Sequence, residues 1–223
     1  MNYKEFKKFA IKNQGITSSN LDRYEKNIEN STRAVIEERP SNFREIDVFS
    51  RLIMDRIIFF GTEVEDSIVN IVVAQLLFLE SVDKKKDISM YINSPGGGVQ
   101  AGLAVIDTMQ WIQPEVATIC CGTAASMGAV FLSVGEKGKR SALKHSRIMI
   151  HQLVGGMRGQ FSDMEISFRY AESLKKDIYT ILSEKTGHPY EKIEKDADRD
   201  FWMRAHEAKE YGIIDNVVEK NLS

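Results

Sequence analysis

One serine, two histidines and a cluster of aspartates are the residues of this chain that could carry out nucleophilic catalysis. Ser126 stands in the stretch GTAASMGAV, between an apolar run typical of a strand and one typical of a helix. A serine at such a turn exposes its hydroxyl at the start of the helix, where backbone N–H groups and the helix dipole can stabilise an oxyanion. The amide of Met127 is the natural donor. Helix capping is the competing interpretation, because serine is a common N-cap residue.

A serine nucleophile needs a general base, and the chain has four histidines. His188 and His206 lie in polar surroundings typical of the surface. His145 is near a strand junction, and His151 ends the apolar stretch RIMIHQ before a glycine-rich segment, where catalytic groups are often presented. A carboxylate should orient the imidazole. The stretch DADRDFWM offers three candidates, among which the residues alone do not choose: Asp196, Asp198 and Asp200.

The loop NSPGGG at residues 93–98 follows a predicted strand and could supply a second oxyanion donor. Glycine allows a backbone N–H to come close to a substrate. Phosphate binding is another use of such loops, but this one matches neither the G-x-G-x-x-G pattern nor a P-loop. A plain turn is the simpler alternative.

A repeated strand–helix pattern must position these residues. The predicted strands are 56–61, 87–92, 116–121, 139–146 and 147–152. The predicted helices are 43–55, 65–81, 100–112, 126–135 and 162–187, the last beginning with a capping box of Ser162 and Glu165 and ending at Gly187. This order predicts an α/β domain whose mainly parallel sheet is covered by helices. A helix as long as the last one is expected to project from the domain.

Residues 1–33 are polar and charged, and we interpret them as an N-terminal extension that is flexible or removed by processing. Tyr3, Phe6 and Ala10 could form one small helical face within it. Residues 34–223 then form the catalytic domain.

Composition narrows the classes of partner. The 223 residues are 43% hydrophobic and 28% charged, with a formal net charge of −2, so a nucleic-acid partner is not expected. The most apolar run, 68–80, is too short to span a bilayer. The two cysteines, Cys120 and Cys121, are adjacent and indicate neither a disulfide nor a metal site. We expect a cytoplasmic protein without cofactor, metal or membrane partner.

Five stretches together resemble the proteolytic subunit of the ATP-dependent Clp protease, a serine peptidase, from about Val35 to Val218. They are YINSPGGGVQAGLAVIDTMQWI, GTAASMGAV, KRSALKHSRIMIHQ, GQFSDMEI and DRDFWMRAHEAKEYGIID. The resemblance implies a crotonase-like α/β fold with a protruding long-helix handle. It implies a triad of Ser126, His151 and Asp200, which settles the choice of aspartate.

The same resemblance implies an oxyanion hole formed by the amides of Gly97 and Met127, and an endopeptidase that cleaves unfolded polypeptides in protein quality control. The implied assembly is a homo-oligomer of two stacked heptameric rings, joined through the handle, with Arg199 at the contact between rings. An AAA+ unfoldase of the ClpX, ClpA or ClpC type is the implied partner. Its implied docking residues are Leu77, Tyr91 and Trp111.

Three positions depart from the family pattern. Leu153 stands where proline usually follows HQ, Gly98 replaces a small polar residue, and Ser89 stands where the docking cleft often has an aromatic side chain. None of these changes affects the triad. Three other interpretations are a catalytically inactive ring subunit, an acyl-CoA enzyme of the crotonase type, and a Ser–Lys peptidase that uses Lys144.

Overall fold

The structure is a computed structural model of the chain, and it describes residues 3–29, 35–39 and 42–219. A seven-stranded sheet forms its centre, with strand order β3-β4-β5-β6-β9, while β7 pairs with β5 and with β8. All of these pairs are parallel except β7–β8. The strands are β3 Ile57–Phe60, β4 Ile88–Ser94, β5 Val116–Ala125, β6 Arg140–Leu143, β7 Arg147–Ile150, β8 Phe201–Arg204 and β9 Asn216–Val218. The predicted α/β class with a mainly parallel sheet is confirmed.

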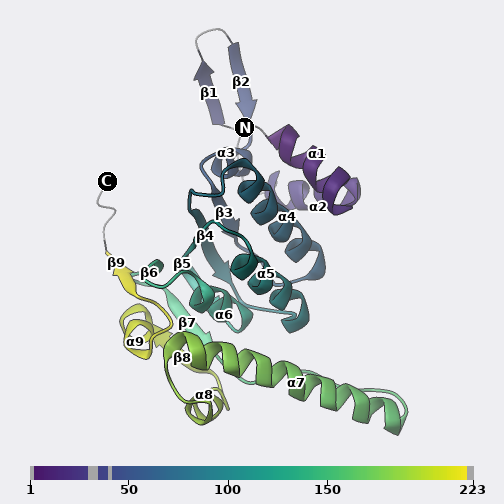
Figure 1. Cartoon of the computed structure of the whole chain (residues 1–223), viewed down its shortest axis with the longest axis vertical. Helices are drawn as coiled ribbons and strands as arrows, with labels where there is room; N and C mark the ends of the chain where they lie inside the picture. Colours follow the sequence, from purple (N-terminus) through teal and green to yellow (C-terminus); the bar gives the residue numbers. More distant parts are fainter. Residues whose placement is uncertain (1–2, 30–34, 40–41, 220–223) are drawn as a thin grey trace.

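Helices α4, α5 and α6 lie together along one side of the sheet (Figure 1). Their apolar residues and alternate residues of β3, β4 and β5 form one buried core, which includes Phe60, Ile92 and Phe131. The helices are α3 Val48–Met54, α4 Asp66–Val82, α5 Val99–Trp111, α6 Met127–Val134, α7 Phe161–Thr186, α8 Tyr190–Asp196 and α9 Ala205–Tyr211. No helix among the described residues is long and apolar enough to cross a membrane.

Strand β5 is long enough to pair with two successive partners on the same edge. Its residues 118–120 pair with β6, and its residues 123–125 pair with β7. Strand β7 in turn pairs with β8, with Ile150 opposite Phe201. These pairings therefore place the end of β5, the end of β7 and the start of β8 side by side.

Helix α7 leaves the body of the protein and extends far beyond it (Figure 1). Its 26 residues correspond to about 39 Å. Its outer half exposes large apolar side chains, among them Phe161, which is 80% exposed, while Ile178 and Leu182 at the inner half are buried. Gly187 ends the helix in the left-handed conformation, at φ 80°. The predicted protruding helix and its glycine cap are confirmed.

Two local predictions are wrong. Residues 43–55 are not one helix: strand β2 (Asn42–Ile46) pairs with β1 (Val35–Arg39), and α3 begins only after Asp47, whose carboxylate accepts the Ser50 N–H at 2.9 Å. The capping box also fails, because α7 begins at Phe161 after Gln160 and has no side-chain cap. Glu165 instead pairs with Arg169 one turn later, at 2.6 Å.

The N-terminal extension contains two helices, α1 (Tyr3–Gln14) and α2 (Ser18–Glu29), and α1 packs on α4. Phe6 and Ala10 of the predicted helical face are fully buried, whereas the side chain of Tyr3 lies outside what the structure describes. The flexibility of this segment stays a prediction. Removal of the extension by processing, and the domain boundary at residue 34, stay predictions.

A buried ion pair joins the C-terminal segment to the sheet. The guanidinium of Arg140 on β6 donates to both carboxylate oxygens of Asp215, at 2.6 and 2.9 Å, and also to the carbonyls of Ser133 on α6 and Lys185 on α7. Burial raises the pKa of Asp215, but the hydrogen bonds and charge of Arg140 outweigh it, and the net pKa lies below its usual range. One side chain thus connects β6, the ends of α6 and α7, and the segment before β9.

We expect Asp215→Ala to lower the free energy of unfolding by about 3–5 kcal/mol, because Arg140 would keep a buried charge without its partner. The control Asp177→Ala changes an exposed carboxylate on α7 and should alter stability by less than about 0.5 kcal/mol. Urea unfolding measures both.

The lowered pKa of Asp215 also determines how its contribution to the free energy of unfolding depends on pH. Its contribution is complete above about pH 4, the ordinary aspartate value, and disappears as the pH falls through the lower folded value. The difference between wild type and Asp215→Ala should therefore shrink below about pH 4. Equal stability of the two proteins at pH 7 would contradict this account.

Candidate active site

Ser126 occupies a strained backbone position between β5 and α6. Its φ and ψ are 55° and −123°, a conformation that residues other than glycine rarely adopt and that costs about 1–3 kcal/mol. Its N–H donates to the carbonyl of Met149 on β7 at 2.8 Å, which fixes the turn to the neighbouring strand. Its side chain makes no helix-capping hydrogen bond. The capping interpretation therefore fails at this residue, and its hydroxyl is free for another role.

The loop after β4 lies directly against this turn, and only glycine fits there. A Cβ on Gly96 would lie 2.5 Å from the Ser126 Cβ and 2.7 Å from the Ala125 carbonyl oxygen, and Gly96 has a φ of +95°. The same Cβ would lie 3.1 Å from the Met127 nitrogen. The glycine-rich loop therefore brings its backbone against the start of α6.

Gly97 and Met127, whose amides are the expected oxyanion donors, line the same pocket. Gly97 forms an isolated parallel bridge with Val64, in which the Val64 N–H bonds to the Gly96 carbonyl and the Gly98 N–H bonds to the Val64 carbonyl, both at 2.8 Å. In a parallel bridge these two bonds come from the residues on either side, so the N–H of Gly97 itself points away from Val64. The N–H of Met127 is at the first turn of α6, where no helix carbonyl is available.

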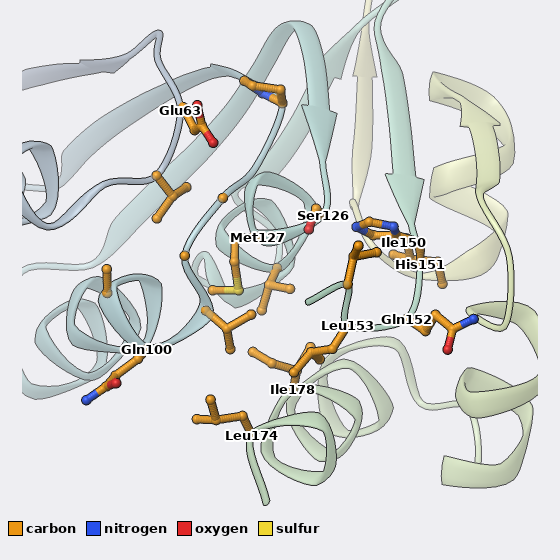
Figure 2. A pocket seen from close by; sticks show the side chains of 18 of the residues that line it. Glu63, Gln100, Ser126, Met127, Ile150, His151, Gln152, Leu153, Leu174 and Ile178 are labelled. Atoms are coloured by element: carbon orange, nitrogen blue, oxygen red, sulfur yellow. The ribbon is translucent and has the colours of Figure 1, made fainter. Parts of the chain in front are cut away.

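His151 and Asp200 are neighbours because of the β7–β8 register. Ile150 lies opposite Phe201, so the residue after Ile150 and the residue before Phe201 are adjacent in an antiparallel pair. The Nδ1 atom of His151 is 3.5 Å from a carboxylate oxygen of Asp200. Figure 2 shows Ser126 beside the imidazole of His151. With Nδ1 facing Asp200, the other ring nitrogen, Nε2, is available to the serine.

Gln152 holds the loop that follows His151. Its side-chain amide donates to the Asp198 carbonyl at 2.7 Å. This bond ties the residues that follow the histidine to the segment that precedes Asp200. The aspartate is the more solvent-accessible partner, since its side chain is 63% exposed against 22% for His151.

Ser126 and His151 line a pocket of about 840 Å³ that also contains Gly97 and Met127. Part of the lining is apolar: Leu174 and Ile178 of α7 lie there near Leu153 (Figure 2), and Leu182 of α7 also lines the pocket. Charged and polar residues also line it, among them Glu63, Glu65, Asp66 and Gln100. The sequence did not identify the role of α7 here, although the apolar spacing of its inner half was a signal that this part of the helix faces other residues.

Neither Cys120, a possible alternative nucleophile, nor Lys144, a possible alternative base, lines this pocket. Burial raises the pKa of the Cys120 thiol to about 11, so it is protonated at neutral pH. Lys144, the base of the Ser–Lys alternative, does not line the pocket and forms an exposed ion pair with Glu219 at 3.5 Å.

The structure brings two of the three expected docking residues together. Leu77 and Trp111 line a shallow surface pocket of about 560 Å³ with Asp107, Thr108 and Gln110, and Trp111 is 74% exposed. Tyr91 is not part of this pocket and lies half-buried on the sheet face, opposite Phe59. Arg199 is exposed and has no ion-pair partner within the part of the chain that the structure describes. The described residues contain no group of three side chains placed to hold a metal.

Comparisons with known proteins agree with this geometry. The family described as Clp protease matches residues 39–221. A protein of Porphyromonas gingivalis named ATP-dependent Clp protease proteolytic subunit is 55% identical over 97% of this chain and 98% of its own length. Proteins of the same name from Bacteroides fragilis and Bacteroides thetaiotaomicron are each 54% identical, over 97% of this chain and 99% of their own lengths.

Gly96→Ala should reduce hydrolysis of a short fluorogenic peptide by at least about 100-fold, because the new methyl group displaces Ser126 and a shift of about 1 Å at a reacting atom has that effect. The control is Gly155→Ala, whose Cβ would meet no atom within 4 Å and whose rate should stay within about twofold. Wild-type activity of Gly96→Ala would refute the close approach of this loop to the serine.

Proposed function

Since the chain belongs to the Clp protease family, we propose that it is the serine peptidase subunit of an ATP-dependent protease, with Ser126, His151 and Asp200 as its catalytic triad. The observation that carries the proposal is the strained turn at Ser126, which lies beside an imidazole whose Nδ1 is 3.5 Å from Asp200. A serine at a plain helix cap needs neither the strain nor the histidine.

In the proposed mechanism, the Ser126 Oγ attacks the carbonyl carbon of the peptide bond while Nε2 of His151 accepts its proton. The amides of Gly97 and Met127 donate to the oxyanion of the tetrahedral intermediate. Collapse of this intermediate breaks the C–N bond, and His151 returns the proton to the leaving amine. A water molecule then attacks the Ser126 ester while His151 accepts its proton, and His151 gives that proton to the Ser126 Oγ as the carboxylic acid product leaves. Asp200 keeps the imidazole in the required tautomer and stabilises its charged form.

The apolar part of the pocket lining supports cleavage after an apolar residue. Met127, Leu174 and Ile178 line the pocket that holds the serine, and no lysine or arginine of the described chain lines it. An apolar side chain buried there replaces water, whereas a charged one would lose its hydration without gaining a partner.

The relatives' name places their peptidase in an ATP-dependent system, and we extend this to an ATPase partner and an oligomer for the present chain. The finer assembly is part of the proposal: two stacked heptameric rings joined through α7, with Arg199 at the contact between rings, and an AAA+ unfoldase that docks at Leu77, Tyr91 and Trp111. Support comes from the apolar outer half of α7, from the exposed Trp111, and from the absence of an ion-pair partner for Arg199 among the described residues. A cytoplasmic location stays a prediction.

Ser126→Ala should lower kcat for a short peptide by about 10⁶-fold, as removal of the nucleophile does in other triad proteases. The control is Ser81→Ala, which removes an exposed hydroxyl of α4 and should leave kcat within about twofold. Steady-state hydrolysis of a fluorogenic peptide measures both variants. Ser126→Ala activity within tenfold of wild type would exclude the proposed nucleophile.

Trp111→Ala should leave cleavage of a short peptide within about twofold and slow ATP-dependent degradation of a folded, tagged protein by at least about tenfold. Loss of an aromatic anchor at a docking site costs roughly 2 kcal/mol or more, which corresponds to about 30-fold in affinity. Both rates are measured on one preparation with the cognate unfoldase. Equal loss of the two rates would mean that Trp111 supports the fold and not docking.

A further inference from the structure

Two short segments carry the histidine and the aspartate of the site beyond the paired part of β7 and β8. Residues 151–153, here called the His arm, follow β7, and residues 197–200, the Asp arm, precede β8. The last paired residues of the two strands are Ile150 and Phe201. Beyond them, no backbone hydrogen bond in the described part of the chain joins one arm to the other. The distance between the arms therefore depends on side chains.

Gln152 supplies a hydrogen bond that links the two arms. Its amide nitrogen donates to the carbonyl of Asp198 at 2.7 Å. Figure 2 shows this side chain pointing away from Ser126, so the amide acts on the Asp arm and not on the reacting atoms. His151 directly precedes the donor, and Asp200 lies two residues after the acceptor. The bond is thus placed to control the separation of the imidazole and the carboxylate.

The carboxylate of Asp200 depends on its backbone for its position. Its side chain is 63% exposed, and it accepts no hydrogen bond from any other residue that the structure describes. The aspartate of a serine protease triad is commonly buried and hydrogen-bonded. The distance of 3.5 Å to Nδ1 of His151 is already at the long limit for a hydrogen bond. A small outward movement of the Asp arm would therefore break this contact.

Tyr211 of α9 supports the Asp arm at both of its ends. Its hydroxyl donates to Asp196, the last residue of α8, at 2.8 Å, and its ring centroid is 5.6 Å from that of Phe201, the first residue of β8. Burial and the bond to Asp196 raise the pKa of Tyr211, so the hydroxyl stays a donor at neutral pH. These contacts hold the arm on α9, whereas the bond from Gln152 holds it to the segment of the histidine.

We propose that Gln152 is a positioning residue for catalysis, whose hydrogen bond to the Asp arm keeps the carboxylate of Asp200 at the imidazole of His151. The inference rests on the proposed triad. Without this bond, the imidazole would lose the group that maintains its tautomer and stabilises its charged form. Gln152 thus affects the chemical step through Asp200, and it does not contribute to the affinity for substrate.

The test compares two substitutions of Gln152. Gln152→Met keeps nearly the same length of side chain but cannot donate a hydrogen bond, whereas Gln152→Lys carries an ammonium group with three donors. Gln113→Met is the matched control, since Gln113 is an exposed glutamine that does not line the pocket of the serine. Hydrolysis of a short fluorogenic peptide gives kcat and KM for each variant, and thermal unfolding verifies that each one is folded.

We expect Gln152→Met to lower kcat at least about tenfold with KM within about twofold, because a misplacement of about 1 Å in a catalytic group can cost about 100-fold. Gln152→Lys should keep kcat within about threefold of wild type, since it restores a donor, and Gln113→Met within about twofold. Loss of one exposed hydrogen bond should shift the unfolding midpoint by less than about 4 °C. A wild-type kcat for Gln152→Met, or an equal loss in Gln152→Met and Gln152→Lys, would overturn the proposal.

A double-mutant cycle with Asp200→Ala separates positioning of the aspartate from general support of the fold. Asp200→Ala alone should lower kcat by about 10⁴-fold, as loss of the triad aspartate does in other proteases. In that background Gln152→Met should change kcat by less than about twofold, because the group that it positions is gone. A further tenfold loss there would overturn the proposal, since Gln152 would then act on another part of the site.

The same cycle distinguishes failure of this inference from failure of the proposed function. A wild-type kcat for Asp200→Ala would refute the proposed triad and the role of Gln152 together. A large loss in Asp200→Ala combined with a wild-type kcat in Gln152→Met would refute the role of Gln152 alone.

Discussion

The register of three strands determines the candidate site. Strand β5 pairs with β7 so that Ala125 lies beside Met149, and β7 pairs with β8 so that Ile150 lies opposite Phe201. These two registers bring the residue after β5, the residue after β7 and the residue before β8 to one point, although they are distant in sequence. A shift of one residue in either pair would turn alternate side chains to the other face and separate Ser126, His151 and Asp200.

The backbone around Ser126 holds the serine in its strained conformation. The strained conformation of the serine persists because its N–H bonds to Met149, while α6 buries every residue after it and Gly96 packs closely against its Cβ. Surrounding structure of this kind can hold a residue in a conformation that it would leave in a free chain. The same packing brings the loop of Gly96 and Gly97 against the start of α6, where Met127 lies, so the two proposed oxyanion donors line one pocket with the serine.

The sequence predicted the sheet and most of the helices on it well, because apolar periodicity and turn residues are local signals. The sequence did not predict the features of the structure that depend on tertiary contacts. Asp47 divides the segment 43–55 by capping α3, and α7 starts at Phe161, one residue before the proposed cap, without a side-chain cap. The packing of α1 on Phe78 and the contribution of Leu174 to the pocket depend on residues far apart in the chain, which no local pattern contains.

The most direct test of the central claim is to label the protein with a fluorophosphonate, which reacts only with activated serines, and to locate the adduct by mass spectrometry. The strained turn and the imidazole together should make Ser126 the labelled residue in the folded protein. His151→Ala should lose most of the labelling, and so should wild type unfolded in urea, because neither retains the geometry that activates the hydroxyl. An adduct on another residue, or equal labelling of Ser126 in the folded and unfolded protein, would contradict the account.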